Sequence, residues 1–124
     1  EWAGRTFPSA VFIAYEQIHP DDAFGRVMVA NLESRGCSLR GLTAFPDIPA
    51  QQTRFLNRGW QSCAVADMND VYYRFLDRTD VVRVEALEMF DEVEEWHMIG
   101  AHYAIVVGIN DGDTEYVRDE MGSA

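Results

Sequence analysis

Three short apolar segments, each bounded by turn-forming residues, constrain the fold of this chain most strongly. They cover residues 10–15, 62–66 and 103–109. Short apolar runs rich in β-branched and aromatic residues are typical of buried strands. Because helical segments separate them, the order of elements predicts an α/β fold. A sheet of three strands leaves an edge and a face poorly covered, so we also expect this chain to begin inside a longer protein.

Two helices are predicted between the first and second strands, with an irregular stretch between them. Each begins after an aspartate, whose carboxylate can accept hydrogen bonds from first-turn N–H groups. Each ends at a glycine, which readily adopts the left-handed conformation that follows a helix. The predicted ranges are 22–35, after Asp21 or Asp22 and before Gly36, and 48–58, after Asp47 and before Gly59.

The segment between the second and third strands predicts further helices. Asp67 can cap a short helix that includes residues 71–76, and Thr79 can cap another turn. The strongest helical pattern covers residues 86–99, which end at Gly100. Its acidic side chains repel one another, so packing must stabilise it; they are Asp91, Glu92, Glu94 and Glu95.

Charge and composition limit the classes of function. The 124 residues carry a formal net charge of −11, and all ten basic residues are arginines without a basic run. This argues against an autonomous nucleic-acid binder, which needs clustered basic side chains. No apolar run reaches the roughly 18–20 residues that a membrane span needs, so we expect a cytoplasmic protein without a membrane partner. We expect one domain over residues 1–109, followed by a flexible polar tail over residues 110–124.

The cysteines and histidines do not predict a metal site or a thiol nucleophile. Cys37 and Cys63 lack CxxC spacing, and reduced thiols are typical of a cytosolic protein. Glu94 and His97 have the Glu-x-x-His spacing of di-iron bundles, but those proteins use that pair twice and add further ligands. We therefore expect no metal.

Five segments resemble the C-terminal half of the leucine carboxyl methyltransferase family, in the same order and at similar spacing, across about residues 2–109. They are FIAYEQ (12–17), DAFGRVM (22–28), RFLNRGW (54–60), ADMNDVY (66–72) and FDEVEEWHMIGAHY (90–103).

The resemblance implies the Rossmann-like fold of class I S-adenosylmethionine-dependent methyltransferases. Residues 10–15, 62–66 and 103–109 would be strands five, six and seven, with the seventh antiparallel and between the other two. The family's glycine-rich loop and ribose-binding acidic residue belong to earlier strands, and no GxGxxG occurs here. We therefore expect no catalytic or cofactor-binding residue in this chain. Its implied partner is the N-terminal half of the domain, without which the chain would be inactive.

Two branches of the family imply two substrates. One branch methylates the side-chain carboxylate of the wybutosine precursor in phenylalanine tRNA, and the other methylates the C-terminal leucine carboxylate of the protein phosphatase 2A catalytic subunit. Residues 45–47, 67–69 and 90–103 look closer to the tRNA branch. An alternative of another class is a non-catalytic interaction module, which would use the open sheet edge or the acidic helix.

Four residues are candidates for a substrate pocket. Tyr15 and Gln17 end the first strand, where α/β sheets form their ligand sites. His102 and Tyr103 begin the last strand, which the resemblance places beside the first. Methylating a carboxylate needs positioning rather than a general base, because the nucleophile is already ionised at neutral pH. The structural alternative is that these side chains only pack or bond to loop backbone.

Overall fold

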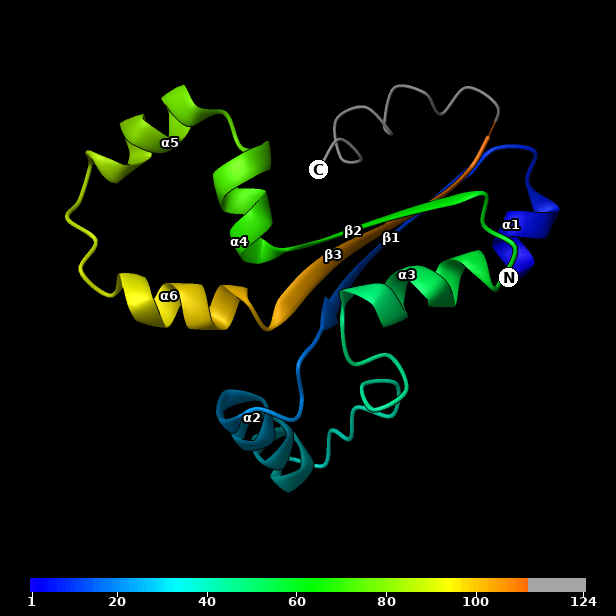
Figure 1. Ribbon diagram of the computed structural model, residues 1–124, viewed down its shortest axis with the longest axis horizontal. Helices are drawn as coiled ribbons and strands as arrows, with labels where there is room; N and C mark the ends of the chain where they lie inside the picture. Colours follow the sequence, from blue (N-terminus) through cyan, green and yellow to red (C-terminus); the bar gives the residue numbers. More distant parts are fainter. Residues whose placement is uncertain (112–124) are drawn as a thin grey trace.

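A computed structural model of the chain describes residues 1–111. Its strands are β1 (Ala10–Gln17), β2 (Ser62–Asp67) and β3 (Tyr103–Asn110). They form one sheet in the order β1-β3-β2, and both pairings are antiparallel. The strand predictions are therefore confirmed, and β3 lies in the centre as the resemblance implies (Figure 1). Of the predicted tail, residues 112–124 lie outside the described part of the chain.

The core lies on the face of the sheet that α3 (Ile48–Leu56) covers. Phe55 from this helix and Trp60 just after it pack against Cys63 of β2 and Val106 of β3. The two rings reach the sheet because Gly108 has no side chain: a Cβ atom there would lie 2.6 Å from Cδ1 of Phe55. The apolar area that these rings bury stabilises the packing of α3 on the sheet.

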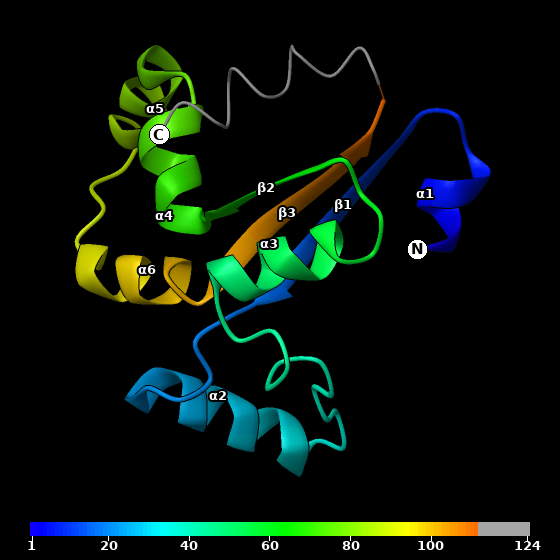
Figure 2. The same cartoon turned by 45° about the vertical axis from the view of Figure 1, so that its right-hand side comes forward.

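The two predicted caps before β2 are confirmed, and Asp22 rather than Asp21 begins α2 (Ala23–Ser34). Its carboxylate accepts a hydrogen bond from the Gly25 N–H at 2.7 Å. Asp47 accepts one from the Ala50 N–H at 2.9 Å at the start of α3. Gly36 and Gly59 follow the helices with φ angles of +77° and +87°. Figures 1 and 2 show α2 standing apart from the sheet, at the end of β1.

Asp67 caps the segment after β2 as predicted, since its carboxylate accepts from the Asp70 N–H at 2.8 Å. The helix continues from α4 (Met68–Asp70) into a π-helical stretch, η1 (Val71–Phe75). The prediction that Thr79 caps the next turn is wrong. Asp77 is the cap of α5 (Arg78–Glu85), because its carboxylate accepts from the N–H groups of Thr79 and Asp80.

The predicted helix over residues 86–99 is wrong in its first half. α5 ends at Glu85, and α6 (Val93–Gly100) begins only after Glu92. In the interior of a longer helix, the acidic side chains would have repelled one another. In the observed helix, Glu94 and Glu95 fall in the first turn, where the positive end of the helix dipole favours them.

A short N-terminal helix, α1 (Trp2–Thr6), has no counterpart in the predictions. The buried Asn110 side chain holds it to the end of the sheet, because its amide donates to the Gly4 carbonyl at 2.9 Å. The Asn110 side-chain oxygen accepts from the Gln61 N–H at 2.7 Å. Within residues 1–111, no helix has the length and apolar character to cross a membrane.

β1 is an edge strand with an uncovered face. Within the described residues it pairs only with β3. Val11, Ile13 and Tyr15 alternate along it and are 60%, 70% and 63% exposed. Apolar side chains at every second position are typical of a strand whose face packs against a further layer of structure.

Candidate functional site

A hollow of about 640 Å³ opens where β1 ends. It lies between the strand ends, α2, α3 and the loop that joins these two helices. Three of the four predicted pocket residues line it: Tyr15, Gln17 and Tyr103. The remaining lining residues are Glu16, Leu32, Ser38, Leu39, Arg40, Gly41, Leu42, Gln51 and Arg54.

The three predicted residues form one continuous wall. The rings of Tyr15 and Tyr103 stack with their centroids 5.3 Å apart and their planes at 11°. The Gln17 amide donates a hydrogen bond to the Tyr103 hydroxyl at 3.1 Å. Antiparallel pairing brings these residues together, since Gln17 lies opposite Tyr103 and Tyr15 points to the same face two residues earlier.

Tyr15 is protonated at neutral pH. Burial and the nearby Tyr103 raise the pKa of its hydroxyl above the ordinary value of 10.0. A neutral hydroxyl can donate a hydrogen bond to an anion but cannot act as a base. The wall therefore offers hydrogen bonding and a stacking surface.

Arg54 of α3 is a lining residue that the sequence did not identify. Its guanidinium group lies 3.2 Å from the Glu16 carboxylate and 3.4 Å from the side-chain oxygen of Gln51. The same group lies 4.7 Å from the centroid of the Phe45 ring. Because Glu16 already balances its charge, Arg54 shapes the hollow rather than offering a free cation. Arg40, on the rim, is exposed and makes no ion pair with any residue in 1–111.

His102, the fourth predicted residue, does not line this hollow. Its ring is buried between α6 and the start of α2. Nδ1 lies 2.7 Å from the Met98 carbonyl oxygen, and Nε2 lies 2.7 Å from a carboxylate oxygen of Asp22. The structure therefore separates His102 from the wall formed by Tyr15, Gln17 and Tyr103, although it precedes Tyr103 directly.

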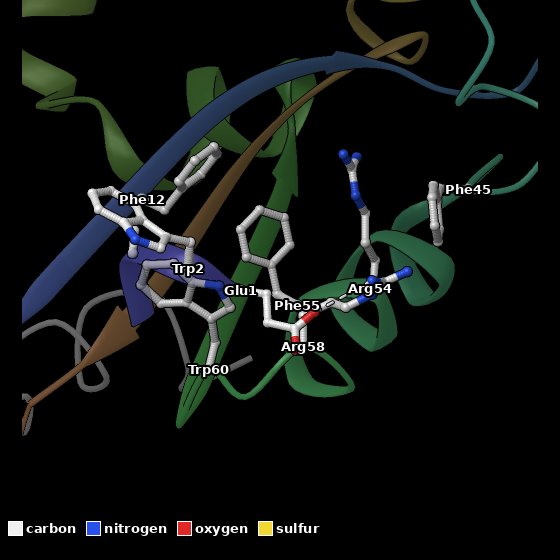
Figure 3. Close-up of a pocket in the computed structure, with 9 residues that line it drawn as sticks. Glu1, Trp2, Phe12, Phe45, Arg54, Phe55, Arg58 and Trp60 are labelled. Carbon is white, nitrogen blue, oxygen red and sulfur yellow. Dashed lines mark ion pairs between the residues drawn. The ribbon is translucent and has the colours of Figure 1, made fainter. Parts of the chain in front are cut away.

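A second hollow, of about 480 Å³, lies at the other end of α3. Figure 3 shows Trp2, Phe12 and Trp60 on one side of Phe55 and Phe45 on the other. Its two guanidinium groups already have carboxylate partners. Arg54 pairs with Glu16, and Arg58 lies 3.6 Å from Glu1. The aromatic rings and the satisfied charges make this a packing site between α1, β1 and α3, without chemical groups left to react.

In the described part of the chain, no three His, Cys, Asp or Glu side chains are grouped closely enough to hold a metal ion. His97, the residue with the Glu-x-x-His spacing, has its ring Nε2 hydrogen-bonded to the Tyr73 hydroxyl. Buried Cys63 lies in the core against Phe55 and Trp60 and lines neither hollow.

Comparison with curated proteins shows close similarity over nearly the whole chain. The chain is 48% identical to a leucine carboxyl methyltransferase 1 homolog of Arabidopsis thaliana, over 98% of its own length and 38% of the relative's. It is 47% identical to human tRNA wybutosine-synthesizing protein 4, over 91% of the chain and 16% of that protein. It is 41% identical to bovine leucine carboxyl methyltransferase 1, over 85% and 31%. No protein-family model matches the chain.

Proposed function

Because this chain belongs to the leucine carboxyl methyltransferase family, we propose that it forms the C-terminal part of an S-adenosylmethionine-dependent carboxyl O-methyltransferase. The observation that supports this most directly is 48% identity over 98% of the chain to a relative that is much longer. The chain spans little more than a third of that relative, so the activity belongs to a longer protein.

The sheet supports the proposed place in the fold. In this proposal β1, β3 and β2 are strands five, seven and six of a Rossmann-like sheet, and β1 pairs along its free edge with the N-terminal half of the domain. The exposure of Val11 and Ile13 agrees with a further layer on that face. The same edge could serve an interaction module by strand addition, so catalysis has to be tested directly.

The methyl donor does not fit this chain alone. S-adenosylmethionine carries a positive sulfonium and ribose hydroxyls, which call for free carboxylates and backbone donors at a strand end. Among residues 1–111, Glu16 supplies the only carboxylate that lines the larger hollow, and Arg54 engages it at 3.2 Å. We propose that residues outside this chain bind the donor, as the family resemblance implies.

The larger hollow is the proposed substrate pocket. A substrate carboxylate is already ionised at neutral pH, so the enzyme's task is to orient it and to exclude water. The neutral Tyr15 hydroxyl can donate to an anion, and the stacked Tyr15 and Tyr103 rings give the pocket a flat apolar wall. Gln17 fixes the second ring through its hydrogen bond.

For the substrate, we propose the wybutosine-precursor carboxylate of phenylalanine tRNA. The resemblance over residues 90–103 and the 47% identity to human tRNA wybutosine-synthesizing protein 4 support this choice. An aromatic wall also suits a modified guanine base, because bases stack on aromatic side chains.

The C-terminal leucine carboxylate of the protein phosphatase 2A catalytic subunit is the second candidate. The 48% identity to the Arabidopsis homolog supports it, and so does the charge of −11, which gives this part of the protein no electrostatic attraction for tRNA.

The test is a methyl-transfer assay with the full-length protein. The two substrates are phenylalanine tRNA carrying the unesterified precursor and phosphatase catalytic subunit with a free C-terminal leucine. A labelled product that mild base hydrolyses is a methyl ester, and the substrate that becomes labelled identifies the branch. If the full-length protein labels neither, the methyltransferase proposal fails and the interaction module takes its place. The 124-residue chain alone is the negative control.

A further inference from the structure

His102 is a buried titratable side chain that the proposed reaction does not use. It is 4% exposed, and each ring nitrogen faces an oxygen atom. Nδ1 lies 2.7 Å from the Met98 carbonyl oxygen, and Nε2 lies 2.8 and 2.7 Å from the two carboxylate oxygens of Asp22. A carbonyl and an ionised carboxylate can only accept hydrogen bonds, so both nitrogens must donate. The ring therefore fits this position in its doubly protonated form.

Asp22 serves two partners with one carboxylate. Besides facing His102, it accepts a hydrogen bond from the Gly25 N–H at 2.7 Å and so caps α2. The Gly25 N–H, and after it the hydrogen bond from His102, hold the pKa of Asp22 below its ordinary value of 3.8. Asp22 is thus ionised at neutral pH, as the pairing with a protonated imidazole requires.

The pair sits directly behind the wall of the larger hollow. The His102 carbonyl accepts a hydrogen bond from the Ile18 N–H at 3.0 Å. Ile18 follows Gln17 in the chain, and His102 precedes Tyr103. This hydrogen bond therefore fixes the backbone next to Gln17 and Tyr103, the two residues whose side chains meet in the wall.

The same pair also joins α2 to the sheet. Both views of the molecule show α2 apart from the other elements, beyond the end of β1 (Figures 1 and 2). The Phe24 ring of α2 packs on the His102 ring with the centroids 4.4 Å apart. Leu32, two turns further along α2, lines the hollow. The position of α2 therefore sets the width of the hollow on that side.

We propose that the ion pair between protonated His102 and Asp22 is a positioning device, which holds α2 and the start of β3 so that Leu32, Gln17 and Tyr103 surround one cavity. Its effect on catalysis rests on the proposed function, because it assumes that this cavity receives the substrate carboxylate. Both are positioning residues, since neither lines the cavity. Within residues 1–111, His19 is a further titratable group beside the pair, with its ring centroid 6.0 Å from that of His102. The groups that α6 and α2 present to the ring, the Met98 carbonyl and the Phe24 side chain, carry no charge.

The test compares two capping aspartates in the full-length protein. Asp22→Asn keeps a cap for α2, because asparagine caps helices about as well as aspartate, but it removes the charge that faces His102. Asp47→Asn is the matched control, since Asp47 caps α3 through the Ala50 N–H at 2.9 Å and has no histidine partner. Asp22→Ser is a second variant of the same kind, since serine is a smaller neutral cap.

The first readout is amide hydrogen exchange of α2 at neutral pH. In the wild-type protein, we expect the contact between His102 and Asp22 to protect residues 23–34. Asp22→Asn should reduce this protection about tenfold, the loss of one charge-assisted contact. Asp47→Asn should leave α2 unchanged.

The second readout is methyl transfer to whichever carboxylate substrate the full-length protein labels. Asp22→Asn should raise KM several-fold with kcat nearly unchanged, because the pocket is misplaced while the reacting groups remain. Equal α2 protection and equal KM in the Asp22→Asn and Asp47→Asn proteins would overturn the proposal. If the wild-type protein methylates neither substrate, the proposed function fails, and α2 protection alone then decides for or against the positioning role.

Discussion

Tyr103 lies against Tyr15 with the two ring planes at 11° and the centroids 5.3 Å apart, so residues from the first and last strands share one stacked surface. The stack depends on the antiparallel register, which places Gln17 opposite Tyr103. The Gln17 amide, bonded to the Tyr103 hydroxyl at 3.1 Å, then limits how that ring can turn. The Tyr15 hydroxyl keeps its donor for a ligand.

Tyr15→Phe in the full-length enzyme should lower kcat/KM for the carboxylate substrate about tenfold, because the ring stack stays while the donor to the anion is lost. The thermal midpoint should hardly change at this exposed position. Steady-state methyl-transfer kinetics measure the effect. Tyr72→Phe is the control, since it removes an exposed hydroxyl that bonds to Glu85 away from the hollow. Unchanged kinetics in Tyr15→Phe would contradict the pocket role.

Gly108→Ala should destabilise the protein by about 1–3 kcal/mol, because overpacked cores force neighbouring side chains out of place. The new Cβ atom would lie 2.6 Å from Cδ1 of Phe55 and 3.2 Å from Cδ2 of Trp60. Gly41→Ala is the matched control, with no heavy atom within 4 Å of its new Cβ. Thermal unfolding of the full-length protein compares the two. Equal midpoints would show that the packing of Phe55 against β3 is not as tight as described.

Asn110→Asp should cost about 1–3 kcal/mol at neutral pH, because the new carboxylate at this buried position leaves the Gly4 carbonyl without its donor. The oxygen that accepts from the Gln61 N–H at 2.7 Å is retained. As the pH falls and the carboxyl group gains a proton, it can donate again, so the loss should shrink. Unfolding midpoints across the acidic range test this. Asn57→Asp, at the exposed C-terminal end of α3, should show only the smaller cost of a negative charge beside that end of the helix dipole.

Cys63 should resist alkylation while Cys37 reacts. Burial raises the pKa of the Cys63 thiol to about 11, so very little reactive thiolate is present at pH 8. Cys37 is exposed. Iodoacetamide labelling followed by peptide mass spectrometry should modify Cys37 first in the folded protein and both residues alike in denaturant. Equal labelling before unfolding would mean that Cys63 is not in the core.

Capping aspartates and glycines in the sequence predicted the helix boundaries that depend on neighbouring residues. The caps at Asp47 and Asp67 are confirmed because each carboxylate bonds to the N–H three residues later. Gly36 and Gly59 end their helices with positive φ angles. The pattern over residues 86–99 misled because it joined apolar residues of the connection after α5 to those of α6. It also placed in a helix interior the acidic side chains that start α6.

The sequence predicted the residues of the candidate site that lie at strand ends. It did not predict the residues whose positions depend on contacts between distant elements. Tyr15, Gln17 and Tyr103 follow from the resemblance, which places their two strands side by side. Arg54 lines the same hollow because Glu16, on another element, holds its guanidinium group. His102 lies behind the wall because Asp22 holds its ring. No sequence spacing encodes either pairing.

The central place of β3 has a consequence for how this region forms during synthesis. β1 and β2 do not pair with each other, and each pairs only with β3 in the sheet described here. A ribosome releases the chain from its N-terminus, so β1 and β2 must wait for residues 103–110 before this sheet can close. Such long-range closure is slow and leaves apolar strands open in the meantime. The nascent chain should therefore need chaperone protection until residues 103–110 emerge.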